Sequence, residues 1–332
     1  MPLDYTISEK ARRLHADSIV FDGHCDTLLE ILDGLRAWDK YEGKGQADLP
    51  RLREGGVTAQ IFAAFVRPAL RYQGPAETLR LIETLYAILD GWPADMLLAT
   101  KAEDVRRAKR EGKIAAVLSL EGSEGLDGDL TLLRAFYRLG VRNIGITHND
   151  RNKAADGCAE ARTGGGLSEF GVALVKEMAR LGIMVDIAHL APAGVEDVFE
   201  IYDGPVVASH ANAKTICDHR RNLSDAQIER VAASGGVIGV TFVPAFIAEN
   251  PAEATVDRLL DHVDHIVKVG GIDCVALGSD WDGFENPPEG FPQDVRGTPL
   301  FTERLLQRGY SEGDVRKFLG ENWLRVFQRV AG

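Results

Sequence analysis

EFGVALVKEMARLGIMVDIAH, residues 169–189, contains one repeating unit of an α/β protein. Apolar residues recur at three- and four-residue spacing over Glu169–Leu181, which predicts an amphipathic helix. Gly182 is a residue type that commonly ends a helix. The apolar run Ile183–Ala188 then has the composition of a buried parallel strand. His189 follows directly, so the unit places an ionisable side chain at the carboxyl end of a predicted strand.

The same unit recurs along the chain, because eight short apolar runs are bounded by turn signals. They are Ser18–Gly23, Val57–Phe65, Ile114–Leu120, Arg142–Thr147, Ile183–Ala188, Pro205–Ser209, Gly236–Phe242 and Asp273–Ser279. Helical patterns separate most of them, and strands that alternate with helices indicate a parallel sheet. We therefore expect an α/β fold, a (β/α)8 TIM barrel, with an open doubly wound sheet as the alternative. No internal repeat or linker divides the sequence, so residues 1–332 are expected to form a single domain.

Composition limits the class of protein and its partners. The 332 residues are 45% hydrophobic and 27% charged, which is ordinary for a soluble globular protein. The net charge of −12 disfavours nucleic acid and anionic membranes as partners. The four cysteines are scattered, which favours a reducing compartment. The N-terminus lacks the apolar core of a signal peptide. No apolar run approaches the length of about 18 residues that a membrane span needs. We therefore expect a cytoplasmic protein.

Ionisable side chains gather at the ends of the predicted strands. His24 and Asp26 follow the first run, Glu121 the third, His148 the fourth, His189 the fifth, His210 the sixth and Asp280 the eighth. In a (β/α)8 barrel the carboxyl ends of all strands meet at one face, which is where such barrels hold their active sites. These seven residues are therefore expected to form one site.

This combination of imidazoles and carboxylates predicts a metal centre. Several carboxylates that repel one another in a cleft are stabilised by divalent cations. Nitrogen and oxygen donors together suit zinc, with manganese, cobalt or iron as alternatives. Two such ions that share a carboxylate and a water produce hydroxide at neutral pH and polarise a carbonyl group. The reaction class that this chemistry indicates is hydrolysis.

A resemblance to a known family adds to this interpretation. The motifs are FDGHCDTLLEIL, SLEGSEGL, THNDRN, GLSEFGVALVKEMARLGIMVDIAH, SHANAK followed by CDHRRN, GSDWDG and GENWLRVFQRV. In this order, and over nearly the whole chain, the sequence resembles the renal (membrane) dipeptidase family of the amidohydrolase superfamily.

The resemblance implies a role for each matching residue. It implies that His24 and Asp26 bind one zinc ion, that Glu121 bridges two zinc ions, and that His189 and His210 bind the second. It further implies that His148 contacts the substrate carbonyl and the tetrahedral intermediate. Arg221 is implied to bind the substrate's terminal carboxylate, and Asp280 to act as the acid and base that moves the proton of the hydroxide and the amine.

The implied function is a binuclear zinc dipeptidase that cleaves L,L- and L,D-dipeptides through a metal-bridging hydroxide, in a family that often forms homodimers. A related amidohydrolase that acts on N-acyl amino acids or cyclic amides is the main alternative. A barrel that has lost catalysis and acts as a binding or structural protein is the second. Such a barrel usually has a broken ligand set, whereas all five implied ligands and Asp280 are present here.

Some positions depart from the family pattern or lie outside it. Ala188 and Ala211 stand where many members have serine, and the segment TFVP after the seventh run has no tyrosine to assist Arg221. Arg67 follows the second run and is a weaker candidate for the cleft. His262 and its neighbour His265 lie three apart on a predicted outer helix, where we expect a solvated face.

Overall fold

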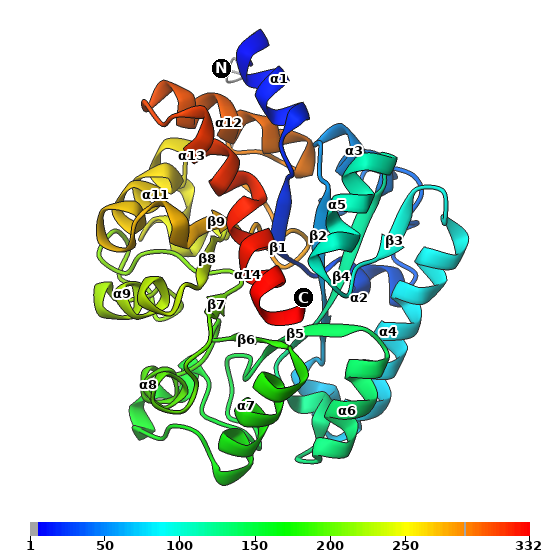
Figure 1. Cartoon of the computed structure of the whole chain (residues 1–332), viewed down its shortest axis with the longest axis vertical. Coiled ribbons are helices and arrows are strands. Elements are labelled where there is room, and N and C mark those ends of the chain that lie inside the picture. Colours follow the sequence, from blue (N-terminus) through cyan, green and yellow to red (C-terminus); the bar gives the residue numbers. More distant parts are fainter. Residues whose placement is uncertain (1–5, 289) are drawn as a thin grey trace.

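A computed structural model describes residues 6–288 and 290–332 of the chain. Eight parallel strands form a nearly closed ring with helices around it, which confirms the expected (β/α)8 barrel (Figure 1). Along the ring the strands are β1 (Phe21–Cys25), β2 (Ala59–Phe65), β4 (Ile114–Glu121), β5 (Val141–Gly145), β6 (Met184–Asp186), β7 (Val206–Ala208), β8 (Val237–Val240) and β9 (Val275–Leu277).

The first and last strands of the ring meet beyond their regular pairing. Cys25 and Trp281 form an isolated parallel bridge. The amide of Asp26 donates to the carbonyl of Trp281 at 2.9 Å, and the amide of Asp280 donates to the carbonyl of His24 at 3.2 Å. The ring of strands therefore closes at His24, Asp26 and Asp280, which sequence analysis assigned to the site.

The strands form where the apolar runs predict them, with different limits. The β4 strand is buried over its whole length, as expected for a strand covered on both faces. Observed β1 begins three residues later than the run Ser18–Gly23, so that His24 lies inside the strand and not after it. The short strand β3 (Met96–Leu98) was not predicted and pairs with β4 outside the ring. Its three residues are too few for a pattern to be recognised.

Helices cover the outside of the ring. They are α1 (Glu9–Asp17), α2 (Thr27–Leu32), α3 (Leu49–Glu54), α4 (Gly74–Gly91), α5 (Ala102–Glu111), α6 (Leu130–Arg138), α7 (Glu169–Leu181), α8 (Pro192–Ile201), α9 (Asp225–Ser234), α10 (Pro244–Ile247), α11 (Val256–Gly270), α12 (Thr298–Gln307), α13 (Glu312–Arg316) and α14 (Asn322–Ala331). The α7 helix has the predicted limits: the Ser168 side chain caps its first turn, and Gly182 ends it in a left-handed conformation with φ 78°.

The C-terminal helix α14 closes one end of the barrel. It lies across the ring of strands in Figure 1. Trp323 and Phe327 belong to a buried cluster with residues near the starts of the strands, such as Phe21. The Trp323 indole donates to the carbonyl of Leu277 at 2.7 Å, and a Cβ on Gly23 would lie only 2.4 Å from the indole. Because this end is filled, the open end is the one at the carboxyl ends of the strands.

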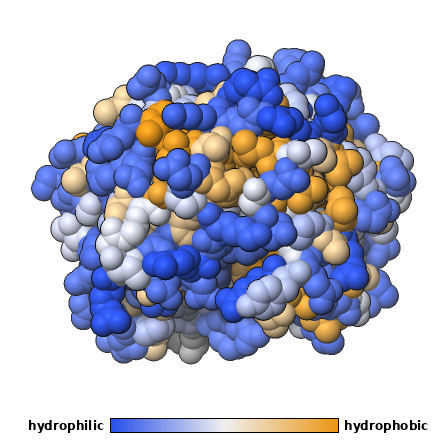
Figure 2. Space-filling view, turned by 90° about the horizontal axis from the view of Figure 1, so that it is seen from below, coloured by the Kyte–Doolittle hydropathy of each residue, from blue (hydrophilic) through white to orange (hydrophobic). Residues whose placement is uncertain are grey.

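The surface is mainly hydrophilic. Figure 2 shows a band of apolar side chains across the face seen there, with hydrophilic residues on both sides of it. Within residues 6–288 and 290–332, we find no helix that is both long enough and apolar enough to cross a bilayer.

Candidate active site

The structure brings together the residues found at the predicted strand ends. His24 lies at the centre of a first group: its Nε2 is 3.6 Å from Asp26 Oδ2, 3.6 Å from Glu121 Oε2 and 3.7 Å from Asp280 Oδ1. Glu121 is the last residue of β4, and Asp280 follows β9. Three carboxyl groups from different parts of the chain thus surround one buried imidazole.

A second group shares Glu121 with the first. Glu121 Oε1 lies 3.0 Å from His189 Nε2, 3.5 Å from His210 Nε2 and 3.9 Å from His148 Nε2. The Nε2 atoms of His189 and His210 are 2.7 Å apart and face each other. We call the combined set the metal-candidate cluster: His24, Asp26, Glu121, His148, His189, His210 and Asp280.

Backbone strain marks two members of this cluster. His189 has φ 66° and Asp280 has φ 68°, both in the left-handed region that residues with a side chain rarely adopt. Such conformations cost about 1–3 kcal/mol each and occur mostly at functional sites. Each places a side chain immediately after a strand, where a regular continuation of the strand would point it elsewhere.

Neighbouring polar groups orient the two histidines of the second group. The Nδ1 of His189 lies 2.9 Å from Asn149 Oδ1, and the Nδ1 of His210 lies 2.8 Å from Ser209 Oγ. A proton on His189 Nδ1, donated to the amide oxygen, leaves the lone pair on Nε2. Sequence analysis did not single out Asn149. Its place in the motif THNDRN, one residue after His148, was the available signal.

The cluster fits divalent cations. Among the described residues, both ring nitrogens of His24 and the Oδ1 atom of Asp26 are buried without a hydrogen-bond partner. Buried polar atoms normally have one, since leaving them unpaired costs about 1–3 kcal/mol. Imidazole nitrogens and carboxylate oxygens together suit zinc or a similar transition metal. Within the residues that the structure describes, three groups of three side chains each hold their donor atoms within 4.8 Å of one another, and all three groups come from this cluster.

The pKa shifts of His189, His210 and Glu121 agree with binding of a divalent cation. Burial, with the nearby Arg221 charge, holds the pKa of His189 well below its usual value, and burial with the His24 charge does the same for His210. Burial and the charge of Glu121 raise the pKa of Asp26 to about 6. The charges of His24 and the other imidazoles outweigh burial at Glu121 and hold its pKa well below the usual range. His189 and His210 therefore offer neutral nitrogens beside an ionised central carboxylate. At His24 the charges of Glu121 and Asp26 outweigh burial and raise its pKa well above the usual value.

Arg221 lies beside this cluster, on the loop after β7. Its side chain is buried, and Nη2 donates to the carbonyl of His210 at 3.0 Å. Its Nε atom has no partner within the part of the chain that the structure describes. A guanidinium held in this way still has donors to offer to a carboxylate.

His262 and Arg67 both have partners within the chain. The solvated helix face expected for His262 is wrong: on α11 its side chain is fully buried, Nδ1 accepts from the Ala213 amide at 3.1 Å and Nε2 donates to the Ile247 carbonyl at 2.9 Å. It thereby holds the loop that follows His210. Arg67 forms an ion pair with Asp33, so its charge is already neutralised within the chain.

A polar network beside β1 and β9 supports the position of Asp280. Asp282, two residues further on, accepts hydrogen bonds from Thr27 Oγ1 and Arg36 Nη2, both at 2.5 Å. The Asp282 amide donates to Gln46 Oε1 at 2.7 Å. Both Asp280 and Asp282 have left-handed backbone conformations, so these contacts hold a strained turn.

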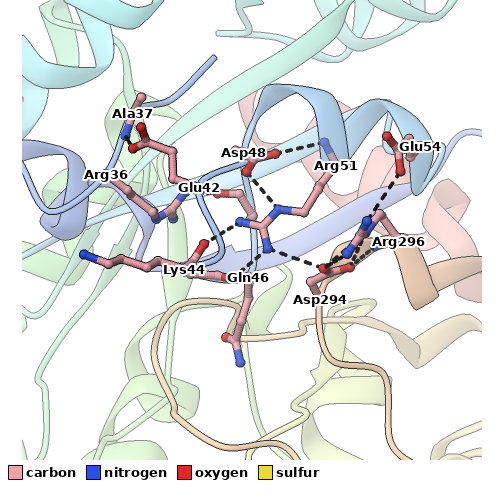
Figure 3. Close-up of polar contacts among 12 residues, drawn as sticks. Arg36, Ala37, Glu42, Lys44, Gln46, Asp48, Arg51, Glu54, Asp294 and Arg296 are labelled. Carbon is pink, nitrogen blue, oxygen red and sulfur yellow. Dashed lines mark hydrogen bonds and ion pairs between the residues drawn. The ribbon is translucent and has the colours of Figure 1, made fainter. Parts of the chain in front are cut away.

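A second polar network surrounds Arg51 on α3, next to the loop that contains Gln46 (Figure 3). Arg51 Nε donates to Asp48 Oδ2 at 2.8 Å, and its Nη atoms donate to the carbonyls of Gly45 at 2.7 Å and Lys44 at 3.0 Å. Asp294 lies 3.4 Å from Arg51 Nη1 and also pairs with Arg296. We call Lys44, Gly45, Asp48, Arg51 and Asp294 the Arg51 network. These contacts fix the loop that contains Gln46, whose side chain accepts a hydrogen bond from the Asp282 amide.

Comparison with known proteins identifies the family. The model of the membrane dipeptidase family, peptidase family M19, matches residues 8–332. The chain belongs to the membrane dipeptidase family. Its M19 barrel is accordingly that of a metallopeptidase family, and the chain is a hydrolase of peptide bonds.

Solved structures of similar proteins share the whole fold. The crystal structure of the dipeptidase AC, a metallopeptidase of family M19, matches with a TM-score of 0.89 and 32% identity over 95% of this chain and 99% of that chain. A metallopeptidase from Rhodobacter sphaeroides, bound to a phosphinate mimic of the dipeptide L-Ala-D-Ala, gives 0.88 and 32% over 95% and 100%. The probable dipeptidase PvdM from Pseudomonas aeruginosa gives 0.90 and 25% over 97% and 98%.

Proposed function

We propose that this M19 protein is a binuclear zinc dipeptidase that cleaves the peptide bond of L,L- and L,D-dipeptides. The observation that carries the proposal is the set of buried donor atoms at His24 and Asp26 that lack a hydrogen-bond partner among residues 6–288 and 290–332. A relative of similar length binds a mimic of L-Ala-D-Ala, which supports the inclusion of D-residues. Residues 1–332 would act as one metal-dependent hydrolase domain.

The proposed ligands divide between two ions. His24 and Asp26 would hold one zinc ion, His189 and His210 the other, and Glu121 would bridge them, since its two oxygens face the two groups separately. When bound, two zinc ions supply a nucleophilic hydroxide at neutral pH and polarise the carbonyl.

Asp280 would move the proton. Burial and the charges of Asp26 and Glu121 raise the pKa of Asp280 well above that of a free carboxyl, which favours uptake of a proton from the attacking water. The protonated carboxyl then donates to the amine nitrogen as the C–N bond breaks. The products are two free amino acids, and Asp280 returns to its carboxylate form.

His148 and Arg221 would position the substrate. The His148 side chain is partly exposed, and burial lowers its pKa, so a neutral imidazole donates a hydrogen bond to the carbonyl oxygen as negative charge develops. Arg221 would bind the carboxylate of the C-terminal residue with donors that its bond to the His210 carbonyl leaves available.

The test is amino-acid release by the zinc-loaded protein from a panel of L,L-dipeptides, L,D-dipeptides and N-acyl amino acids. Release from dipeptides, including those with a C-terminal D-residue, is expected. Turnover of N-acyl compounds or cyclic amides alone would favour the alternative amidohydrolase function. No turnover by protein that contains two zinc ions would contradict the proposal.

Two further properties belong to this proposal. We propose a homodimer, and the apolar band in Figure 2 is a surface of the kind that subunit interfaces bury; sedimentation or light scattering tests it. We also propose a cytoplasmic location, which the four free, buried cysteines of the chain support.

A further inference from the structure

A pocket of about 320 Å³ lies next to His148, on the side of the barrel formed by the loops after β2, β4 and β5. Phe65, Val66 and Tyr72 contribute apolar surface to it, and Glu124 lies at its wall. The ring of Phe65 contacts that of His148, with centroids 4.4 Å apart. The pocket therefore adjoins the residue that we place on the substrate carbonyl.

The basic residues of this pocket are already engaged within the chain. Lys153 Nζ lies 2.6 Å from Asp127 Oδ1, and Arg151 forms an ion pair with Asp156. The guanidinium of Arg71 lies over the ring of Tyr72, 5.1 Å from its centroid. The charges of Lys153 and Arg151 are thus neutralised within the chain, whereas the Arg71 guanidinium keeps its charge.

Glu124 is in the opposite situation. Its Oε2 atom is buried and has no hydrogen-bond partner among the residues described, and its Oε1 receives a single hydrogen bond, from Asn152 Nδ2 at 3.3 Å. Burial raises the pKa of Glu124 to about 7. A buried carboxylate in this state gains most from a cationic partner, because the partner replaces the lost solvation and restores the ionised form.

The position of the pocket identifies which part of a dipeptide reaches it. Arg221 follows β7 and would hold the carboxylate of the C-terminal residue, whereas the pocket lies across the site beside β2, β4 and β5. A dipeptide whose carbonyl lies at His148 then directs the side chain of its N-terminal residue toward the pocket. The apolar walls suit the methylene groups of a long side chain, and Glu124 suits a positive charge at its end.

We propose that this pocket selects dipeptides whose N-terminal residue is lysine or arginine, with Glu124 as the residue that determines this specificity. The inference rests on the proposed function, because it uses the expected orientation of a dipeptide between Arg221 and His148.

The experiment compares lysyl-alanine with norleucyl-alanine, which has the same chain length without the amine. In the wild-type protein kcat/KM is expected to be at least about tenfold higher for lysyl-alanine, the scale of one hydrogen-bonded charge. Glu124→Gln keeps the shape and is expected to lower this ratio about tenfold or more. Glu83→Gln removes an exposed carboxylate on α4 outside the pocket and is expected to leave the ratio unchanged.

A binding measurement separates this inference from the proposed function. Calorimetry compares L-lysinamide with L-norleucinamide on the zinc-loaded protein, and tighter binding of L-lysinamide that Glu124→Gln abolishes would support the pocket even if no dipeptide were cleaved. Cleavage of dipeptides with a lysine-to-norleucine ratio near one, or a ratio that Glu124→Gln leaves intact, would overturn the inference and leave the proposed function standing. Equal binding of the two amides would also overturn it.

Discussion

The metal-candidate cluster and the Arg51 network are both buried and charged, yet they differ in how their polar atoms are paired. Within the described residues, both ring nitrogens of His24 lack a hydrogen-bond partner, whereas the Arg51 guanidinium donates to a carboxylate and two carbonyls (Figure 3). The two regions are linked, since Gln46 lies in the loop that Arg51 fixes and binds Asp282. Because buried polar atoms usually have a hydrogen-bond partner, the unpaired ring nitrogens of His24 are available to a ligand.

Two buried histidines show the same contrast within one residue type. His24 and His262 are 1% and 0% exposed, so burial alone does not distinguish them. His262 uses both ring nitrogens to join two loops. His24 uses neither for a hydrogen bond within the part of the chain described. We infer that His262 is structural and that His24 is a ligand.

The largest effect is expected at Asp280. Asp280→Asn removes the proton acceptor but keeps the shape, so kcat is expected to fall by about 10²–10⁴-fold, the usual contribution of general acid–base catalysis. Zinc content, measured by elemental analysis, should stay near that of the wild type. Substantial residual kcat would exclude Asp280 from proton transfer.

Zinc tests the contrast between the two regions directly. At about a thousand times its dissociation constant, zinc is expected to stabilise the metal-free protein by about 4 kcal/mol, and His24→Asn should lose most of this gain. Arg51→Met should lower the free energy of unfolding by about 3–5 kcal/mol, because it leaves the buried Asp48 carboxylate without its ion pair. It should nevertheless keep the gain from zinc. Chemical unfolding with and without zinc measures both, and equal zinc stabilisation in the His24 variant would contradict the comparison.

His262 predicts a pH dependence of stability. Burial lowers its pKa to about 4 from 6.5, so between these values the unfolded state binds more protons than the folded state. Its contribution is therefore complete above about pH 6.5 and is lost as the pH falls toward 4, a difference of about 3 kcal/mol. We expect the metal-free wild type to lose about this much more stability than His262→Asn between pH 7 and 4. Parallel unfolding curves would show that the ring does not titrate as described.

The smallest effect is expected at Arg221. Arg221→Met removes a charged hydrogen-bond donor, worth about 1.5–3 kcal/mol, so KM for dipeptides should rise by about 10–100-fold with a smaller change in kcat. Arg220→Met, which changes the exposed neighbour, provides the control. An unchanged KM in the Arg221 variant would mean that another residue binds the carboxylate.

The sequence predicted the parts of this protein that depend on local pattern. Buried parallel strands are nearly continuous apolar runs, and their carboxyl ends meet in a barrel, so His189 and Asp280 could be assigned to one site although they are 91 positions apart in the numbering. The resemblance to the dipeptidase family added their expected roles, which stay predictions.

Features that depend on packing between distant segments were not predicted. Helical periodicity does not show that a loop covers His262, and a run of three residues does not distinguish β3 from a turn. The partner of Arg67 lies 34 positions away in sequence, and the unpaired oxygen of Glu124 is a property of the folded pocket. Predicting each of these features requires the three-dimensional positions of residues that are far apart in the sequence.

The meeting of the first and last strands has a consequence for biogenesis. The Ser279 amide donates to Asp22 across 257 positions of sequence, beside His24 in β1 and next to Asp280. At about 5–20 residues per second, a ribosome needs on the order of 10–50 s between making these two segments. During that interval the nascent chain already has His24 and Asp26 but not the strand that encloses them. We therefore expect stable metallation only after the ring has closed, late in translation or after release.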